Sequence, residues 1–369
     1  MTLFCRHLQN GLVYNNNTTS FTVSPCCFFQ NFNNEIDPSK NLDRQLQLYR
    51  TKWMTADVSK HCKICIDAEN QKLSSYRQSS FDIIEGIESN LEFLTVAVNK
   101  KCNLACPSCD SSCSSFWYQE NTRHGVVEIP KIRNMHDEDR QGEITNRFID
   151  LLADQDLSKL KYIKFGGGEP LMSDTHERIL SLISYPEQVT IQYTSNFSIM
   201  PSQSVIELWH KFKLVKWVAS LDGIGEKFSF LRWPYRWEKL ENFVRQAVDQ
   251  VPDNVMFGVE HTINPLNVYF FNEFSNWFDQ SFSANRYGDK SDFNIHICNG
   301  VLGLENTPPK LRTKILEKYG TDHAVSIALQ QTPYSGNTKQ LVAYLDQLDT
   351  WRGTRWRKIF GEVQDFFYA

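Results

Sequence analysis

The chain has 369 residues, of which 41% are hydrophobic and 22% charged, and its formal net charge is −4. A length of this order suggests two or three units, or one barrel with appendages, and provides a large core without disulfide support. The slightly acidic balance excludes a general nucleic-acid coat, which needs a basic surface, so we expect no nucleic-acid partner.

The compartment follows from what the sequence lacks. No stretch approaches the ~18 consecutive apolar residues of a membrane helix. The first residues have no apolar run behind a basic leader, so we expect neither export nor a membrane partner but a cytoplasmic location. In that reducing compartment, clustered cysteines indicate metal or redox chemistry more often than disulfides.

The first cysteine group along the chain comprises Cys5, Cys26 and Cys27, and the pair Cys62 and Cys65 in the string HCKIC. We call these five residues the N-terminal cysteines. Paired C-x-x-C units are typical of tetrahedral zinc sites, so zinc is an alternative to an iron-sulfur cluster for this group.

The second group follows in the string KCNLACPSC, with Cys102, Cys106 and Cys109, and then Cys113. Zinc fits this group less well, because no suitably spaced histidine supplies a fourth ligand. A four-iron cube accepts three protein thiolates and leaves one iron open to another molecule. The spacing therefore predicts a [4Fe-4S] cluster with an open iron site.

From about residue 90 the sequence alternates strand and helix signals. The predicted strands are 91–98, 162–165, 189–193, 215–221, 255–263 and 293–297. The predicted helices are 144–152, 179–183, 205–212, 237–251 and 269–282, and, beyond residue 299, 311–319 and 341–351. Repeated strand–helix steps predict a parallel sheet with helices outside, which can close partly into a barrel.

Four candidate functional residues follow successive predicted strands. Cys102 follows the first, Glu169 the second, Asn196 the third and Asp222 the fourth. The carboxyl ends of parallel strands lie at the same edge of a sheet, so we expect these residues to converge. The aromatic string FSFLRWPYRW at 228–237 is interpreted as a loop that covers the barrel mouth.

Together, KCNLACPSC, FGGGEPL and ASLDG resemble the radical S-adenosylmethionine (SAM) superfamily. The N-terminal cysteines resemble those of a narrower group, in which a SPASM-like twitch domain precedes the barrel. The resemblance implies an α/β fold: a partial (β/α)6 barrel with a small cysteine-rich twitch domain before it and a helical extension after it. The implied domains are 1–85 (twitch and auxiliary iron-sulfur cluster), 86–300 (partial barrel) and 301–369 (helical extension).

The same resemblance implies two clusters. Cys102, Cys106 and Cys109 would hold the [4Fe-4S] cluster whose open iron binds SAM. A second, auxiliary [4Fe-4S] cluster would be ligated by N-terminal cysteines, namely Cys5, Cys26, Cys62 and Cys65, with Cys27 as the alternative to Cys26.

SAM itself would contact residues at the ends of the second to fourth strands and Arg232. These candidates are Gly167, Gly168, Glu169, Pro170, Ser195, Asn196, Ser220, Asp222 and Arg232. Glycine lets the backbone approach the methionine moiety, and Glu169 can accept a charge-assisted hydrogen bond from its ammonium group. The alternative is that serine, asparagine, aspartate and glycine serve as turn residues here, and that Arg232 stacks on aromatic rings.

A radical enzyme can also need a hydrogen-atom donor. Cys298 follows the last predicted strand, and Cys113 lies beside the cluster motif, so both are candidates. The alternative for each is a buried, inert thiol.

The predicted activity is reductive cleavage of SAM to a 5′-deoxyadenosyl radical, which abstracts hydrogen from a substrate carbon. The resemblance favours a peptide or protein substrate and implies a reductant protein such as a flavodoxin or ferredoxin. The alternatives are the same chemistry on a nucleotide, sugar or other small molecule, or a zinc-stabilised binding module without catalysis.

Overall fold

The computed structural model describes residues 5–15, 22–27, 29, 34–37, 40–70, 75–78, 90–97, 99–283 and 292–368. The chain forms two compact units. Unit 1 comprises Met1–Lys101, Glu128–Thr194 and Pro201–Trp217, and unit 2 comprises Cys102–Val127, Ser195–Met200 and Val218–Ala369. The segment 102–113, which we call the cysteine loop, therefore opens unit 2.

The described strands follow the hydrogen-bonded order β3-β2-β1-β4-β5-β6-β7-β8-β9. Their bounds are β1 (Gly11–Asn15), β2 (Thr22–Ser24), β3 (Asn34–Glu35), β4 (Phe93–Ala97), β5 (Tyr162–Gly166), β6 (Thr190–Ser195), β7 (Leu214–Ser220), β8 (Val255–Ile263) and β9 (Asp292–Ile297). The pairs β1–β4, β4–β5, β5–β6 and β8–β9 are parallel, and β1–β2 and β2–β3 are antiparallel. The predicted α/β class with a parallel-rich sheet is confirmed, whereas closure into a partial barrel stays a prediction.

The helices fall into the two units. Unit 1 contains α1 (His7–Asn10), α2 (Leu42–Thr55), α3 (Val58–His61), α4 (Lys63–Asn70), α7 (Pro130–Met135), α8 (Glu138–Ala153), α9 (Thr175–Leu180), α10 (Gln203–Trp209) and the short η1 (Pro170–Met172) and η2 (Pro186–Gln188). Unit 2 contains α6 (Ser115–Arg123), α11 (Gly225–Leu231), α12 (Trp237–Gln250), α13 (Phe271–Phe278), α14 (Pro309–Tyr319), α15 (Ala324–Gln331), α16 (Thr338–Arg352), α17 (Trp356–Ile359) and the short η3 (Val268–Phe270), η4 (Asp279–Ser283), η6 (Leu304–Asn306) and η7 (Gln364–Tyr368).

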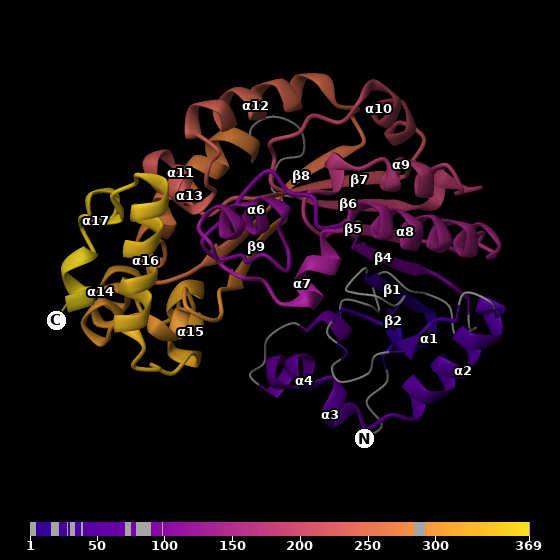
Figure 1. The fold of residues 1–369 in the computed structure, drawn as a ribbon, viewed down its shortest axis with the longest axis horizontal. Helices are drawn as coiled ribbons and strands as arrows, with labels where there is room; N and C mark the ends of the chain where they lie inside the picture. Colours follow the sequence, from indigo (N-terminus) through magenta and orange to yellow (C-terminus); the bar gives the residue numbers. More distant parts are fainter. Residues whose placement is uncertain are drawn as a thin grey trace. The chain divides into compact units, whose positions relative to one another are not determined.

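In unit 1, α8 shows why the sequence forms a helix against the sheet. Asp137 caps it by accepting a hydrogen bond from the Arg140 backbone N–H, which satisfies one of the unpaired donors of the first turn. Its buried side chains recur at helical spacing and include Phe148 and Leu152. Phe148 stacks on Tyr14 of β1, and Figure 1 shows α8 and α9 alongside β4, β5 and β6.

The N-terminal strands belong to the same sheet as β4. In the parallel β1–β4 pair, Gly11 is opposite Phe93 and Asn15 is opposite Ala97. The antiparallel strands β2 and β3 then extend that edge. The N-terminal segment thus adds strands directly to the sheet that leads into the cysteine loop.

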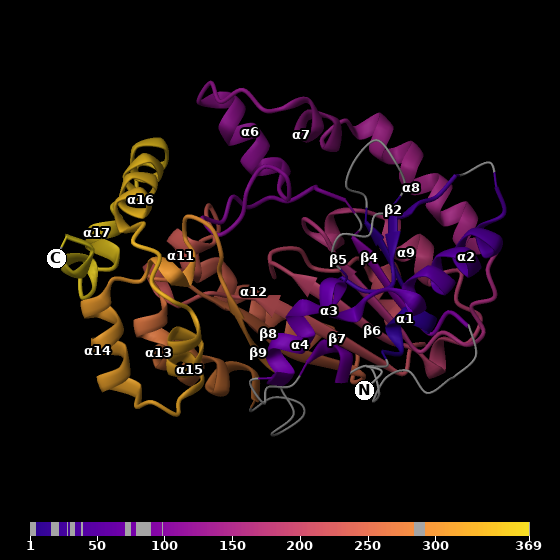
Figure 2. The same ribbon diagram turned by 90° about the horizontal axis from the view of Figure 1, so that it is seen from below.

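In unit 2, the C-terminal helices share one hydrophobic core with the end of β8 and with α11. Ile263 of β8 and Phe230 of α11 pack in the same buried cluster as Leu345 of α16 and Trp356 of α17. Both views show α14, α15, α16 and α17 gathered near the C-terminus (Figures 1 and 2). The predicted helical character beyond residue 299 is confirmed.

The structure corrects the interpretation of 228–237 as one loop. Residues 228–231 belong to α11, and α12 begins at Trp237, so irregular backbone is confined to 232–236. The helix expected at 269–282 is present as three consecutive helical segments, η3, α13 and η4, which cover residues 268–283 without a gap.

Among the helices of the described residues, none combines the length and apolar character needed to cross a lipid bilayer.

Candidate functional site

Hydroxyl groups at the start of α6 hold the cysteine loop by its backbone. The Ser115 hydroxyl accepts a hydrogen bond from the Cys102 N–H at 3.0 Å and lies 3.1 Å from the Cys102 carbonyl, to which it donates. The Ser114 hydroxyl donates to the Leu104 carbonyl at 2.6 Å and caps α6 by accepting from the Trp117 N–H at 3.2 Å. The same serines thus begin the helix and shape the loop.

Three consecutive carbonyl groups of the loop, at residues 105–107, accept hydrogen bonds from three different side chains. The donors are Arg352 Nη2 at 2.9 Å, Trp117 Nε1 at 2.8 Å and the Tyr344 hydroxyl at 2.9 Å. With these carbonyls held, the loop around Cys106 has a defined path without a metal.

Two of the predicted cluster thiols lie within hydrogen-bond range of nitrogen donors. Asn196 Nδ2 lies 3.8 Å from Cys102 Sγ, and Arg232 Nη1 lies 3.8 Å from Cys106 Sγ. Donors to sulfur favour the thiolate form, which is the form that ligates metals. The predicted convergence of Asn196 with Cys102 is thus present within unit 2.

The third thiol pairs with Cys113. A hydrogen bond that the Cys109 thiol donates to Cys113, and then burial, raise the pKa of Cys109 far above its ordinary value. Burial also raises the pKa of Cys106, and the Arg232 guanidinium opposes part of that rise. Without metal these thiols hold their protons near neutral pH, so metal binding must displace them.

Among the described residues, no group of three or more His, Cys, Asp or Glu side chains is arranged to hold a single metal ion. A cube separates its thiolate ligands over its corners, so its ligands do not need to converge as those of a single zinc ion do. The assignment of Cys102, Cys106 and Cys109 as cluster ligands stays a prediction.

Asp222 and Arg232, both predicted SAM contacts, form an ion pair with each other. Arg232 Nε lies 2.8 Å from Asp222 Oδ2, with side-chain exposures of 11% and 1%. Asp222 Oδ1 also accepts from the Thr262 N–H at 2.9 Å. Burial opposes the charge of Arg232, but Asp222 and Cys106 raise its pKa. Arg232 therefore stays protonated and places a positive charge beside the Cys106 thiol.

The residues after β6 serve the backbone and the cysteine loop. Ser195 Oγ accepts from the Phe197 N–H at 3.1 Å, and Phe197 has a φ of 59°, a left-handed conformation that is rare for a bulky residue. Asn196 Nδ2 donates to Asn103 Oδ1 at 2.8 Å. The other predicted contact of this kind, Ser220, is half-buried at the end of β7.

In unit 1, the GGGE segment after β5 docks on the backbone that leads into the cysteine loop. The Gly168 N–H donates to the Asn99 carbonyl at 2.8 Å, and the Glu169 N–H to the Lys101 carbonyl at 2.7 Å. A Cβ at residue 168 would lie 2.2 Å from the Lys101 carbonyl oxygen, so no larger residue fits without movement. Gly167 has a φ of 116°, which also requires glycine.

The close approach at Gly168 is thus explained by the protein's own backbone, whereas the sequence argument attributed it to a ligand. Glu169 is fully buried, and its carboxylate accepts from the Leu171 N–H at 3.2 Å. Pro170 occupies the first position of η1, as expected for a residue without an N–H.

Cys298 lies directly after β9 and is buried. Burial, and then the negative charges of Asp222 and Glu305, raise the pKa of its thiol to about 12. The group therefore keeps its hydrogen at physiological pH, as a hydrogen-atom donor must.

The N-terminal cysteines form a second set of interacting thiols, in unit 1. Burial, followed by Cys5 and Cys65, raises the pKa of Cys62 to about 11. Cys27 is exposed, and its thiol interacts electrostatically with that of Cys65. Cys26 is buried, and the choice between Cys26 and Cys27 stays open.

The side chains of the cysteine loop fit an anionic iron-sulfur cluster. None of the described cysteines is joined in a disulfide, so their sulfur atoms can serve as ligands. An amide and a guanidinium face two of the thiols, which suits the negative charge of thiolates. A further guanidinium donor, Arg352 Nη1, is buried without a hydrogen-bond partner in the described structure.

Sequence reasoning missed the residues that hold the loop from outside the motifs. Glu120 and Arg352 form an ion pair with exposures of 4% and 1%, in which Arg352 Nε lies 3.1 Å from Glu120 Oε1. Tyr344 lies two turns before Arg352 on α16. The available signal was weak: a glutamate and an arginine on amphipathic helices look like exposed residues until the helices are placed.

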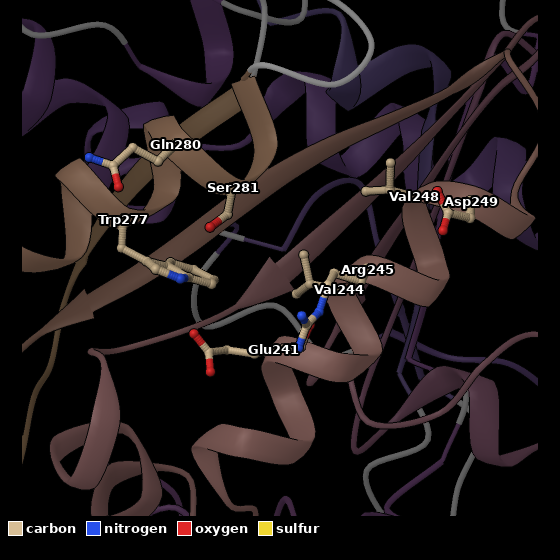
Figure 3. Close-up of a pocket in the computed structure, with 8 residues that line it drawn as sticks. All are labelled: Glu241, Val244, Arg245, Val248, Asp249, Trp277, Gln280 and Ser281. Atoms are coloured by element: carbon tan, nitrogen blue, oxygen red, sulfur yellow. The ribbon is translucent and has the colours of Figure 1, made fainter.

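A separate cavity of about 470 Å3 lies between α12 and the segment formed by α13 and η4 (Figure 3). Its lining residues are Glu241, Val244, Arg245, Val248, Asp249, Trp277, Gln280 and Ser281. None of the predicted site residues lines it.

Comparisons with known proteins give a partial structural likeness only. No protein-family model matches the chain, and no curated protein matches it. The structure "Native anSMEcpe with bound AdoMet" is 15% identical with a TM-score of 0.41, over 65% of this chain and 62% of that one. Streptococcus suis SuiB bound to S-adenosylmethionine is 13% identical with a TM-score of 0.35, over 88% and 54%. TYW1 with a lysine-pyruvate adduct bound is 15% identical with a TM-score of 0.30, over 58% and 70%.

The matched part therefore spans less than two thirds of anSMEcpe and of SuiB. At such identities and TM-scores the likeness assigns neither activity nor substrate to this chain. The functional argument rests on the site itself.

Proposed function

We propose that the chain is a radical SAM enzyme. The observation that carries this proposal is the cysteine loop. Its carbonyls are held by α6 and α16, and two of its three motif thiols are approached by Arg232 and Asn196. A loop shaped in advance around three thiols, with cationic and amide donors beside them, suits a bound anionic cluster.

In this proposal Cys102, Cys106 and Cys109 hold a [4Fe-4S] cluster with one open iron. When bound, the cluster and SAM supply the one-electron chemistry that yields a 5′-deoxyadenosyl radical. The chain's own part is to hold the thiols, to balance their charge with Arg232 and to exclude water.

We further propose that SAM lies against the segment Gly167–Pro170 and the ends of β6 and β7. Glu169 would accept from the ammonium group, and Ser195, Asn196 and Ser220 would contact the remaining polar groups. Because Asp222 and Arg232 pair with each other, we assign that pair mainly to holding the Cys106 side of the site.

For the N-terminal cysteines we propose an auxiliary [4Fe-4S] cluster in a twitch-like region, 1–85, before the barrel region 86–300 and the helical region 301–369. The interaction of Cys5, Cys62 and Cys65 supports a shared ligand set. Cys26 or Cys27 would complete it. Zinc at these thiols is the competing assignment.

The proposed substrate is a peptide or protein, from a carbon of which hydrogen is abstracted. Nucleotides, sugars and other small molecules are the alternative substrates. A flavodoxin or ferredoxin would supply electrons, and the cytoplasm is the proposed location.

Cys298 is the better of the two candidate hydrogen-atom donors, because its raised pKa keeps its S–H intact, whereas Cys113 is engaged with Cys109. A thiyl radical left on Cys298 would take up an electron from the reductant and a proton. The variant Cys298→Ser should still cleave SAM but form no product. Unchanged product from both Cys298→Ser and Cys113→Ser would remove the donor role from this pair.

The proposal is tested by anaerobic purification and by incubation with SAM and a chemical reductant. We expect a brown protein with about eight irons if both clusters are cubes, and release of 5′-deoxyadenosine. A colourless, zinc-loaded protein that leaves SAM intact would favour the binding module. Deuterium transfer from labelled peptides or metabolites into 5′-deoxyadenosine would then identify the substrate class.

A further inference from the structure

Arg352, the last residue of α16, reaches the cysteine loop from far along the sequence. Its Nε and Nη2 atoms pair with the Glu120 carboxylate at 3.1 and 2.6 Å, and Nη2 also donates to the Ala105 carbonyl at 2.9 Å. The guanidinium carbon lies 4.7 Å from the ring centre of Trp117 and 5.8 Å from that of Trp233. Nε, Nη2 and the planar surface of the guanidinium thus all have partners.

The remaining group, Nη1, is buried and has no hydrogen-bond partner among the residues that the structure describes. The Arg352 side chain is only 1% exposed, so water does not supply the missing acceptor from bulk. A buried charged donor without an acceptor is costly, which makes such groups rare unless a ligand completes them. This orphan donor therefore points to a group that binds at the site.

The neighbourhood indicates what that group is. The guanidinium of Arg352 lies against the segment that carries Cys106, because its Nη2 donates to the carbonyl of the preceding residue, Ala105. The loop carbonyls on either side of Cys106 are bound by Arg352 and by Tyr344. An acceptor at this place would be anionic and would be attached to Cys106.

We infer that Arg352 is a positioning residue that holds the cysteine loop through Ala105 and donates through Nη1 to a sulfur atom of a cluster bound at Cys106. This inference rests on the proposed function and extends it to the helical region beyond the barrel. Three thiolates outweigh the positive charge of the iron-sulfur core, so the bound cluster is anionic and gains further negative charge on reduction. A hydrogen bond and a positive charge beside it stabilise the reduced form, and so raise its reduction potential.

One face of α16 supplies this support. Tyr344, Leu348 and Arg352 are four residues apart, so they lie on the same side of the helix. Leu348 packs in one buried cluster with Ala105 and Trp117, between the two polar contacts. The helix thus contacts the loop through an apolar centre with a hydrogen bond at each end.

The test uses variants of the full chain that keep the fold. Arg352→Met together with Glu120→Leu removes both charges, so that neither is left buried alone. The matched control is Arg357→Met, which removes an arginine of α17 that is paired with Asp346 of α16. After anaerobic reconstitution we measure iron content, and then the reduction potential by electron paramagnetic resonance, without SAM.

We expect the double variant to have a more negative potential than the wild type, and the Arg357→Met control to match the wild type. If the double variant binds no cluster, Arg352→Lys is measured instead. Lysine keeps the positive charge but lacks the forked donors of the guanidinium, so we expect a smaller negative shift of the reduction potential. Tyr344→Phe should lose iron to a chelator about fivefold faster, the effect of one hydrogen bond.

Potentials equal to that of the control in every Arg352 variant would overturn the inference. Weakened SAM binding with an unchanged potential would also overturn it, because the donor would then serve SAM. A wild-type protein that assembles no cluster would instead contradict the proposed function, so the two failures are distinct.

Discussion

The two cysteine groups differ in how the rest of the chain supports them. Around the cysteine loop, side chains of α6 and α16 bind three carbonyls, and Asn196 after β6 and Arg232 after α11 approach two thiols. The N-terminal cysteines lie mainly in or beside short helices. The ion pair near them, Glu69–Arg77, has side-chain exposures of 16% and 12%. The comparison teaches that the loop is shaped before metal binds, whereas we expect the N-terminal group to gain more of its order from metal.

The largest expected effect separates the two groups. Cys106→Ala should abolish SAM cleavage, because two thiolates do not hold a cube stably. Changing Cys62 and Cys65 to Ala should spare cleavage but impair product formation. Both activities are followed by chromatography of 5′-deoxyadenosine and of product. Equal loss of both in the two variants would mean that the N-terminal group is merely structural.

The next largest effect is the loss of stability when the buried ion pair of each region is broken. Arg352→Met alone leaves Glu120 charged and buried, which should lower the free energy of unfolding by about 3–5 kcal/mol. Arg77→Met, beside the N-terminal cysteines, should cost less, about 1–3 kcal/mol, because that pair is less deeply buried and Glu69 keeps its hydrogen bond from Ser75. Urea denaturation of the metal-free proteins measures both. Equal losses would show that burial does not distinguish the two sites.

Acid should weaken both regions through buried histidines. Burial lowers the pKa of His7 and of His261 from 6.5 to about 4, so the folded protein resists the proton that the unfolded chain accepts. This stability is present above the unfolded pKa and is lost as the pH falls towards 4. From pH 7 to pH 5 each histidine should cost about 2 kcal/mol.

The variants His7→Phe and His261→Phe should each reduce that pH dependence, as measured by denaturation at both pH values. His261 has Asp222 and Arg232 beside it, and its Nδ1 donates to the Leu221 carbonyl, so its variant also loses one hydrogen bond at every pH. A pH dependence unchanged by either variant would contradict the assignment.

The smallest expected effect is the stability lost when the N-terminal cap of a helix is removed, which we compare for α6 and α2. Ser114→Ala removes the cap of α6 and the bond to the Leu104 carbonyl, and should cost about 2 kcal/mol and slow cluster assembly. Asn41→Ala removes the exposed cap of α2 and should cost about 1 kcal/mol without effect on assembly. Thermal melting and the rate of absorbance gain during reconstitution measure these effects.

Much of the fold could be predicted because strand and helix periodicity is strong after residue 90. The strand 255–263 agrees residue for residue with β8, and α12 and α16 differ from the prediction by only a few residues at their ends. The short strands β1 to β3 were missed, because two to five residues carry too little alternation to detect.

For the candidate site, the sequence supplies the proposed ligands Cys102, Cys106 and Cys109 through their motif, and that assignment stays a prediction. The support of the loop was not predictable, because the Glu120–Arg352 pair joins positions 232 residues apart and depends on tertiary packing. Gly168 was predicted in part. The need for glycine was expected from a close approach of SAM, but the group that approaches it is the Lys101 carbonyl.

The central claim is that the cysteine loop alone holds a cluster with an iron open to SAM. The most direct measurement is electron paramagnetic resonance of a reduced variant in which all five N-terminal cysteines are replaced by alanine, before and after SAM is added. The account predicts about four irons per chain and a spectrum that changes with SAM. A variant without iron, or a spectrum indifferent to SAM, would contradict it.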